Sequence, residues 1–257
     1  MSEQYDLIAF GGGSGGLAAA QRAAEYGARA LVIERGRLGG TCVNVGCVPK
    51  KVMWHASELA QSFRDAPAYG FAAGEPVHDW AALVERREAY IERLNGIYAR
   101  NLDKRNVDWI AGTARLTAKD SVEVDGKAFT APHIIVATGG EPLVPKLPGA
   151  DLGITSDGFF ELRARPDNVA VAGSGYIAVE LAGVLRGLGA NVQLFARYDS
   201  ILRAHDAMLQ QGALRSLAEQ GVDVHLHSIP SAVEQEGDSL RLTVESGKHF
   251  SGFDTLI

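Results

Sequence analysis

The sequence is poor in cysteine, has no long apolar run and carries no excess of positive charge. Only 2 of its 257 residues are Cys, which excludes a disulfide-rich scaffold. No apolar run approaches the roughly 18 residues needed to cross a bilayer, and the acidic start MSEQYD leads directly into an apolar segment, which argues against a signal peptide. The net charge of −6 leaves no broad basic surface for nucleic acid. We therefore expect a soluble, cytoplasmic protein that has neither nucleic acid nor a membrane as its partner.

What the sequence does contain is 30 glycines and a repeated order of elements. An apolar strand, a glycine-rich turn, a helix and a second strand are expected at residues 5–10, 11–16, 17–26 and 30–34. The same order returns at residues 169–172, 173–178, 179–188 and 192–196. Each copy is typical of a Rossmann-like dinucleotide-binding unit, so the predicted fold class is α/β with two such units.

The turns of the two copies carry small residues at matching positions. These are Gly11, Gly13 and Gly16 in the first copy and Gly173, Gly175 and Ala178 in the second. The first position allows the tight turn, the second lets the backbone approach a pyrophosphate, and the third keeps helix and strand close. Because the following helix offers free N–H groups and the positive end of its dipole, each turn is predicted to bind phosphates.

The copies differ at the end of their second strand, where an acid normally accepts a hydrogen bond from the adenosine ribose. The first copy has Glu34 there, whereas the second has Ala196, followed by Arg197 and Arg203. Loss of the carboxylate together with added guanidinium groups favours a ribose that carries a 2′-phosphate. The first unit is therefore predicted to hold an unphosphorylated ribose and the second NADP. The alternative is that the two arginines form a solvated surface pair.

A connecting region separates the two copies. A long helix is expected over residues 80–105, and short strands over 109–110, 114–116, 121–124 and 133–140. Prolines then mark a linker, which places the boundary near Glu141 and gives domains of residues 1–141 and 142–257.

Both cysteines, Cys42 and Cys47, lie in one short glycine-rich segment. A structural disulfide, half of a metal site and two buried apolar residues are all possible interpretations. Zinc usually takes four ligands and no second cysteine pair exists, so we expect no metal site. Reducing conditions disfavour a structural bridge, which leaves a reversible redox pair as the favoured reading. At a helix start beside Lys50, a lowered thiol pKa is expected.

Two segments carry a resemblance to a known family, the pyridine nucleotide–disulfide oxidoreductases. They are GGTCVNVGCVPKKVMWHA at residues 39–56 and GSGYIAVELAG at residues 173–183, and the similarity runs over residues 5–257. The resemblance implies that electrons pass from NADPH to FAD, then to the cysteine pair, then to glutathione disulfide. Lys50 after Pro49 favours the glutathione or trypanothione branch, and Ala18 offers no acid for a cationic substrate. Reductases of trypanothione, mercuric ion or dihydrolipoamide, and a nucleotide-binding chain without turnover, stay open as alternatives.

The resemblance also implies roles for individual residues. Cys42 matches the thiol that attacks the substrate disulfide, Cys47 the thiol beside the flavin, and Lys50 a cation at the flavin edge. Glu180 matches the ion-pair partner of that cation, on the other domain. Residues matching FAD contacts are Ser14, Gly15, Glu34, Thr41, Cys42, Lys50, Ala114, Thr138 and Gly139. Residues matching NADP contacts are Ser174, Ile177, Arg197, Arg203 and the aromatic gate Tyr176. Tyr98 and Ser14 are expected to contact glutathione, with core packing as the alternative for Tyr98.

One feature departs from the family pattern, which is the length of the chain. Family members have roughly three domain units, and 257 residues are too few for them. The expectation is therefore an N-terminal portion, inactive by itself, that lacks the C-terminal interface domain. In the family that domain builds a homodimer and supplies a His–Glu pair for proton transfer.

Overall fold

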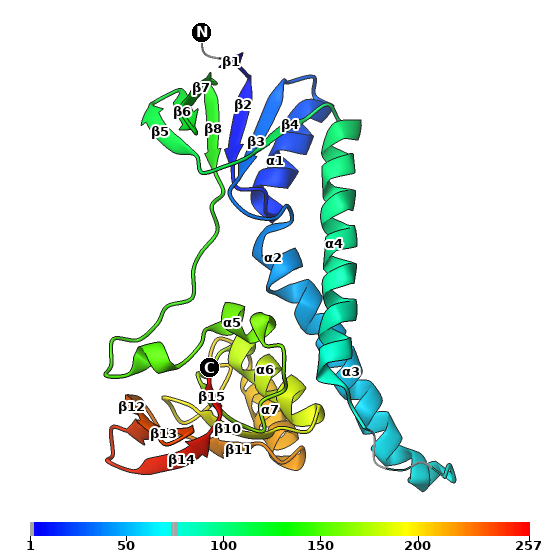
Figure 1. Ribbon diagram of the computed structural model, residues 1–257, viewed down its shortest axis with the longest axis vertical. Helices are drawn as coiled ribbons and strands as arrows, with labels where there is room; N and C mark the ends of the chain where they lie inside the picture. Colours follow the sequence, from blue (N-terminus) through cyan, green and yellow to red (C-terminus); the bar gives the residue numbers. More distant parts are fainter. Residues whose placement is uncertain (1–2, 73, 75–76) are drawn as a thin grey trace. The chain divides into compact units, whose positions relative to one another are not determined.

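The computed structural model describes residues 3–72, 74 and 77–257, and its contacts divide the chain into two units (Figure 1). Unit 1 consists of Met1–Pro49 and Arg86–Glu141, and unit 2 of Lys50–Glu85 and Pro142–Ile257. The expected domains differ from these units because residues 50–85 group with the second unit. The assignment of one nucleotide to each domain stays a prediction.

Unit 1 is built on a parallel sheet with the strand order β4-β3-β2-β8. Its strands are β2 (Leu7–Phe10), β3 (Ala30–Glu34), β4 (Asp108–Ala111) and β8 (His133–Val136). Helix α1 (Ser14–Glu25) packs on one face through a core that includes Leu17, Ala20 and Val32. Strand β3 is almost entirely apolar, as expected for a strand that is covered on both faces.

The opposite face of this sheet is covered by a second sheet with the order β1-β7-β6-β5. Its strands are β1 (Glu3–Gln4), β5 (Arg115–Ala118), β6 (Ser121–Val124) and β7 (Lys127–Thr130). Ile8, Ile33 and Phe129 belong to the core between the two layers. Asp125 and Gly126 connect β6 to β7, both at positive φ, as expected for a hairpin turn.

Unit 2 repeats the parallel arrangement in the order β11-β10-β9-β15. Its strands are β9 (Asn168–Ala172), β10 (Asn191–Phe195), β11 (Asp223–His225) and β15 (Thr255–Leu256). Helix α6 (Tyr176–Gly187) contacts β9 and β10, and α7 (Ala207–Glu219) contacts β11. An antiparallel sheet of β12 (Pro230–Glu236), β13 (Ser239–Val244) and β14 (His249–Phe253) shares a core with Phe195 of β10. The 3₁₀ turn η2 (Ala150–Leu152) and helix α5 (Ser156–Glu161) precede β9.

The remaining helices lie between residues 40 and 104, a stretch that is divided between the two units. They are α2 (Gly40–Asn44), α3 (Cys47–Asp65), the 3₁₀ turn η1 (Ala66–Tyr69) and α4 (Trp80–Lys104). Within unit 2, the indole N–H of Trp80 donates to the carbonyl oxygen of Leu162 at 3.1 Å, and Arg64 donates to the carbonyl oxygen of Gly187 at 3.1 Å. These contacts are among those that join residues 50–85 to the rest of unit 2.

Where the sequence predicted the bounds of an element, most of them agree with the structure. Two helices begin earlier in the chain than predicted. Helices α1 and α6 begin at Ser14 and Tyr176, whereas Leu17 and Val179 were expected. Each starts directly after a glycine N-cap, Gly13 or Gly175, in extended conformation. Part of each predicted turn therefore belongs to the helix. Strand β8 ends at Val136, so residues 137–140 lie outside it.

Within the described part of the chain, no helix is both long enough and apolar enough to span a membrane. Likewise, the described residues include no group of three or more His, Cys, Asp or Glu side chains that could hold a metal ion.

Candidate active site: a thiol pair and two nucleotide turns

The first glycine-rich turn brings three stretches of backbone into close contact. Gly11 has φ +104°, and a Cβ on Gly16 would collide with the Gly11 carbonyl oxygen. A Cβ on Gly40 would lie 2.7 Å from the Gly13 Cα, so the start of α2 rests against the turn. Among the described residues no side chain caps α1 at Gly13. The first N–H groups of α1 are thus left for an anion, and a pyrophosphate fits this cradle.

The Glu34 carboxylate is held beside this turn by two backbone amides. Gly12 donates its N–H to Oε2 at 2.6 Å, and Gly36 donates to Oε1 at 2.7 Å. A carboxylate oxygen accepts more than one hydrogen bond, so both oxygens keep the capacity to accept from ribose hydroxyls. The acid is therefore fixed at the end of β3 in the position where the sequence predicts ribose binding.

The two cysteines flank the junction of α2 and α3. Cys42 lies half-buried in α2, whereas Cys47 is exposed and is the first residue of α3, and both are free thiols. The Asn44 side chain donates to the carbonyl oxygen of Gly40 at 2.9 Å, and Asn95 of α4 donates to the Asn44 side-chain oxygen at 3.0 Å. This amide network supports the short helix that carries Cys42, and no sequence motif indicated it.

Burial raises the pKa of the Cys42 thiol above its usual range. The hydrogen bond with the Cys47 thiol and the negative charge of that thiol raise it further, while the Cys47 backbone N–H acts in the opposite direction. The lowered pKa expected from the sequence is therefore wrong for Cys42. The helix N-terminus does act on its sulfur, but burial and the neighbouring thiol outweigh that effect.

This geometry predicts the order in which the two thiols react with iodoacetamide in the cofactor-free chain. Cys47 should be alkylated first because it is exposed, and alkylation of Cys42 should rise only at higher pH because a raised pKa leaves less thiolate. Cys47→Ser removes the neighbouring thiol and should speed the reaction of Cys42 at a fixed pH. Peptide mass spectrometry over a pH series measures both rates. Faster labelling of Cys42 in the wild-type chain would contradict the assigned burial.

Lys50 of α3 and Glu180 of α6 form an ion pair in unit 2. The Lys50 Nζ lies 2.6 Å from the Glu180 Oε1, and their side chains are 23% and 37% exposed. The pairing expected from the sequence is confirmed. Its description as a link between two domains is wrong, because both residues belong to unit 2. The pair instead joins the first turn of α3 to the second turn of α6.

The second glycine-rich turn is more open than the first. Among the described residues no atom lies within 4 Å of a Cβ placed on Gly175, and Ala178 packs 3.2 Å from a Cβ placed on Gly173. Tyr176 and Ile177, at the start of α6, are 61% and 43% exposed. The Ser174 carbonyl oxygen accepts a hydrogen bond from the Leu202 N–H at 2.7 Å. A phosphate has room to reach this helix N-terminus.

Arg197 and Arg203 are brought together at the end of β10, as the sequence predicts for a phosphate-binding pair. Both are exposed and both contact the ring of Tyr198, while Ala196 is fully buried. Among the described residues neither guanidinium has a carboxylate partner. The sequence offered no reason to single out Tyr198.

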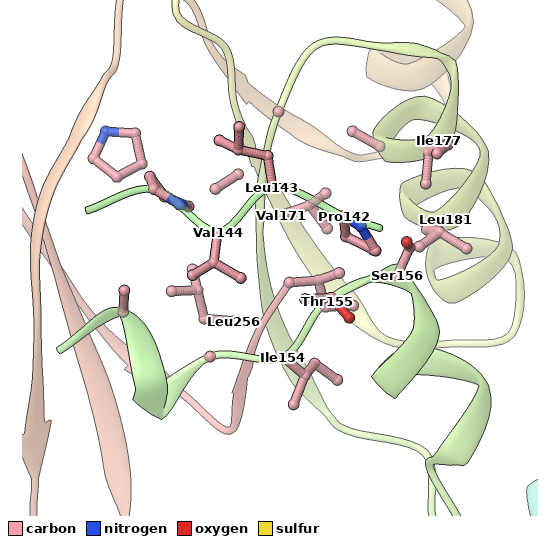
Figure 2. A pocket seen from close by; sticks show the side chains of 18 of the residues that line it. Pro142, Leu143, Val144, Ile154, Thr155, Ser156, Val171, Ile177, Leu181 and Leu256 are labelled. Carbon is pink, nitrogen blue, oxygen red and sulfur yellow. The ribbon is translucent and has the colours of Figure 1, made fainter. Parts of the chain in front are cut away.

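A cavity of about 350 Å³ opens beside the second turn in unit 2. Figure 2 shows that its wall includes Leu143 and Val144 of the linker and Ile177 and Leu181 of α6. The volume lies within the range of about 300–1,000 Å³ that small-molecule sites occupy. The prolines of the linker indicated only a domain boundary, so the sequence missed its part in this cavity.

The other candidate residues fall at several places in unit 1. Thr41 is exposed in α2, and Thr138 and Gly139 are exposed after β8. Ala114 packs against the core between the two sheets. Tyr98 of α4 is half-buried and packs against the core that includes Leu17. Packing therefore accounts for Tyr98 in this structure, and its contact with a substrate stays a prediction.

The chain has two parallel sheets, and in each of them a glycine-rich turn follows one strand, β2 or β9. Together with the thiol pair at a helix start, this defines a two-unit α/β protein with a dithiol site. The family model described as "Pyridine nucleotide-disulphide oxidoreductase" matches residues 5–257. The chain belongs to this family.

Two curated relatives from yeasts are similar over nearly the whole chain. The glutathione reductase of Yarrowia lipolytica is 47% identical over 256 residues, and that of Schizosaccharomyces pombe is 45% identical over 238 residues. These alignments cover 94% and 89% of the chain but only 54% and 51% of the relatives, so the chain spans about half their length.

A solved structure gives the same picture of the fold. The HOCl-induced flavoprotein disulfide reductase RclA from Escherichia coli matches with a TM-score of 0.85 and 25% sequence identity. The match covers 98% of this chain and 55% of that protein. The α/β fold with two dinucleotide-binding units, predicted from the sequence, is confirmed.

Proposed function

We propose that the protein is a flavoprotein that uses NADPH to reduce glutathione disulfide through Cys42 and Cys47. The observation that carries this proposal is the pair of free thiols, with Cys42 half-buried in α2 and Cys47 exposed at the start of α3. The names of the two yeast relatives support glutathione disulfide as the substrate. The homodimer and the cytoplasmic location expected from the sequence belong to the same proposal.

The proposed reaction balances as two disulfide exchanges followed by one reduction. The Cys42 thiolate attacks one sulfur of glutathione disulfide, and the disulfide bond breaks. One glutathione leaves as a thiolate that takes up a proton, and the other stays bound to Cys42. Cys47 then attacks the Cys42 sulfur, which releases the second glutathione and leaves a Cys42–Cys47 disulfide. A hydride equivalent from NADPH, which is two electrons and one proton, and one further proton from solvent restore the two thiols.

The chain's own residues supply binding and orientation for this chemistry. The flavin, when bound, relays two electrons from the nicotinamide to the disulfide. We assign its pyrophosphate to the N-terminus of α1 and its ribose to Glu34. The Lys50–Glu180 pair fixes a positive charge at the start of α3, which we assign to the flavin edge. The cavity beside Tyr176 is our candidate for the nicotinamide end of NADPH.

The coenzyme preference provides the test of the NADPH assignment. The double variant Arg197→Met, Arg203→Leu should bind NADPH more weakly, because each guanidinium–phosphate contact contributes about 1.5–3 kcal/mol, or roughly 10- to 150-fold. Its affinity for NADH should change little, since NADH lacks the 2′-phosphate. Calorimetric titration with both coenzymes measures the two affinities. Arg215→Met, at an exposed arginine of α7, serves as the control for loss of positive charge. Equal losses for both coenzymes would overturn the assignment.

A panel of disulfides tests the substrate. With the full-length protein and NADPH as the reductant, we expect glutathione disulfide to be reduced faster than trypanothione disulfide or lipoamide, and mercuric ion to be a poor substrate. A preference for one of the others would move the protein to that branch of the family. Nucleotide binding without reduction of any substrate would instead support a nucleotide-binding chain without turnover.

A further inference from the structure

The ring of Tyr198 lies within cation–π distance of both arginines that follow β10. The Arg203 Cζ is 3.7 Å from the ring centroid, and the Arg197 Cζ is 5.5 Å from it. Two guanidinium groups near the same ring carry like charges, and the negative face of the ring attracts each of them. The Tyr198 ring, 40% exposed, therefore makes cation–π contacts with both arginines.

Stacking leaves the hydrogen-bonding capacity of the guanidinium groups intact. A guanidinium stacks through its flat face, whereas its five N–H donors point outward in its plane. A phosphate is bound by these edges, so Arg203 can stack on the ring and donate to an anion at the same time. The ring removes rotational freedom from the arginine before a ligand arrives.

The backbone around Tyr198 is fixed to its surroundings at several points. The Tyr198 carbonyl oxygen accepts from the His227 N–H at 3.1 Å, and Leu202, immediately before Arg203, donates its N–H to the Ser174 carbonyl oxygen at 2.7 Å. Leu202 has φ +54°, an uncommon conformation for a leucine. This hydrogen bond ties the segment that carries Arg203 to the glycine-rich turn, so the spacing between turn and arginine is set by backbone.

We propose that Tyr198 is a positioning residue that preorganises Arg197 and Arg203 for a ribose 2′-phosphate and so determines coenzyme specificity. The inference rests on the proposed function, since it assumes that the arginines bind this phosphate. Preorganised side chains lose less conformational entropy on binding, and the affinity for the phosphate rises accordingly. Removing the ring weakens binding of the 2′-phosphate alone and leaves the rest of the nucleotide unaffected.

The test compares two small ligands that differ only in the 2′-phosphate, 2′,5′-ADP and 5′-AMP, by calorimetry on the chain. Wild-type protein should bind 2′,5′-ADP about 10-fold or more tightly than 5′-AMP. Tyr198→Leu should weaken 2′,5′-ADP about 3- to 10-fold and leave 5′-AMP unchanged. Tyr198→Phe keeps the ring and should retain wild-type selectivity. Tyr69→Leu, at an exposed tyrosine elsewhere in unit 2, should change neither ligand.

The outcomes separate this inference from the proposed function. Equal affinity of the wild-type chain for both ligands would overturn the NADPH assignment itself. Selectivity in the wild-type chain that Tyr198→Leu fully retains would overturn only the role of Tyr198. An equal loss for both ligands in Tyr198→Leu would show a general structural role and would also overturn it.

Discussion

In the full-length protein, serine in place of either Cys42 or Cys47 is expected to abolish NADPH-dependent reduction of glutathione disulfide. Loss of a nucleophile that acts as a unit with its neighbours typically lowers kcat by about 10³- to 10⁶-fold. Both thiols are needed in the proposed mechanism, in which Cys42 attacks the substrate and Cys47 releases the product from Cys42. Steady-state oxidation of NADPH in the presence of glutathione disulfide measures the effect. Near-normal rates in either variant would contradict the mechanism.

The two variants should also fail in different ways, which separates the two roles. Flavin-loaded Cys47→Ser, mixed with glutathione disulfide, should keep one glutathionyl group on Cys42 because the resolving thiol is missing. Flavin-loaded Cys42→Ser should form no such adduct and should retain a long-wavelength absorption band from the Cys47 thiolate beside the flavin. Intact-mass spectrometry and a visible spectrum read out the two signatures. The opposite pattern would exchange the roles of the two cysteines.

Much of the fold could be predicted from the sequence because its signals are local. Strand β3 coincides with the continuous apolar run at residues 30–34, and α4 with the helical pattern that begins at Trp80. In the first turn the glycines marked close backbone approach, because a Cβ on Gly11 or Gly16 would collide with a backbone carbonyl oxygen. The resemblance of the two motifs to those of the family also predicted the Lys50–Glu180 ion pair.

Other features depend on contacts between distant residues, and the sequence did not reveal them. The assignment of residues 50–85 to unit 2 depends on side chains such as Trp80, which meets a carbonyl group 82 positions away. The pKa of Cys42 depends on its burial and on the Cys47 thiol, and neither can be judged from spacing alone. The contact of Tyr198 with two arginines likewise follows from the path of the chain after β10.

At the third position of the glycine motif, too, the sequence alone does not reveal how tightly the residue is packed. The difference leads to a prediction about stability. Gly16 and Ala178 occupy equivalent positions, so the motif treats glycine and alanine as interchangeable there. In the structure they are not equivalent. Ala178 packs 3.2 Å from a Cβ placed on Gly173, whereas a Cβ on Gly16 would collide with the Gly11 carbonyl oxygen. The first turn is therefore too tight for the methyl group that the second turn contains.

Gly16→Ala is accordingly expected to lower the free energy of unfolding by about 3 kcal/mol, because the obstacle is backbone and cannot rotate away. That loss corresponds to a fall in the thermal midpoint of roughly 6–12 °C for a chain of this size. Flavin binding should fall as well, since α1 must move away from Gly11 and takes its N–H groups with it. Gly183→Ala in α6 is the matched control, because among the described residues no atom lies within 4 Å of the added Cβ. The control should gain about 0.5–1 kcal/mol from the better helix former. The thermal midpoints of both variants test this prediction. Similar midpoints would show that the first turn accommodates the added methyl group without a loss of stability.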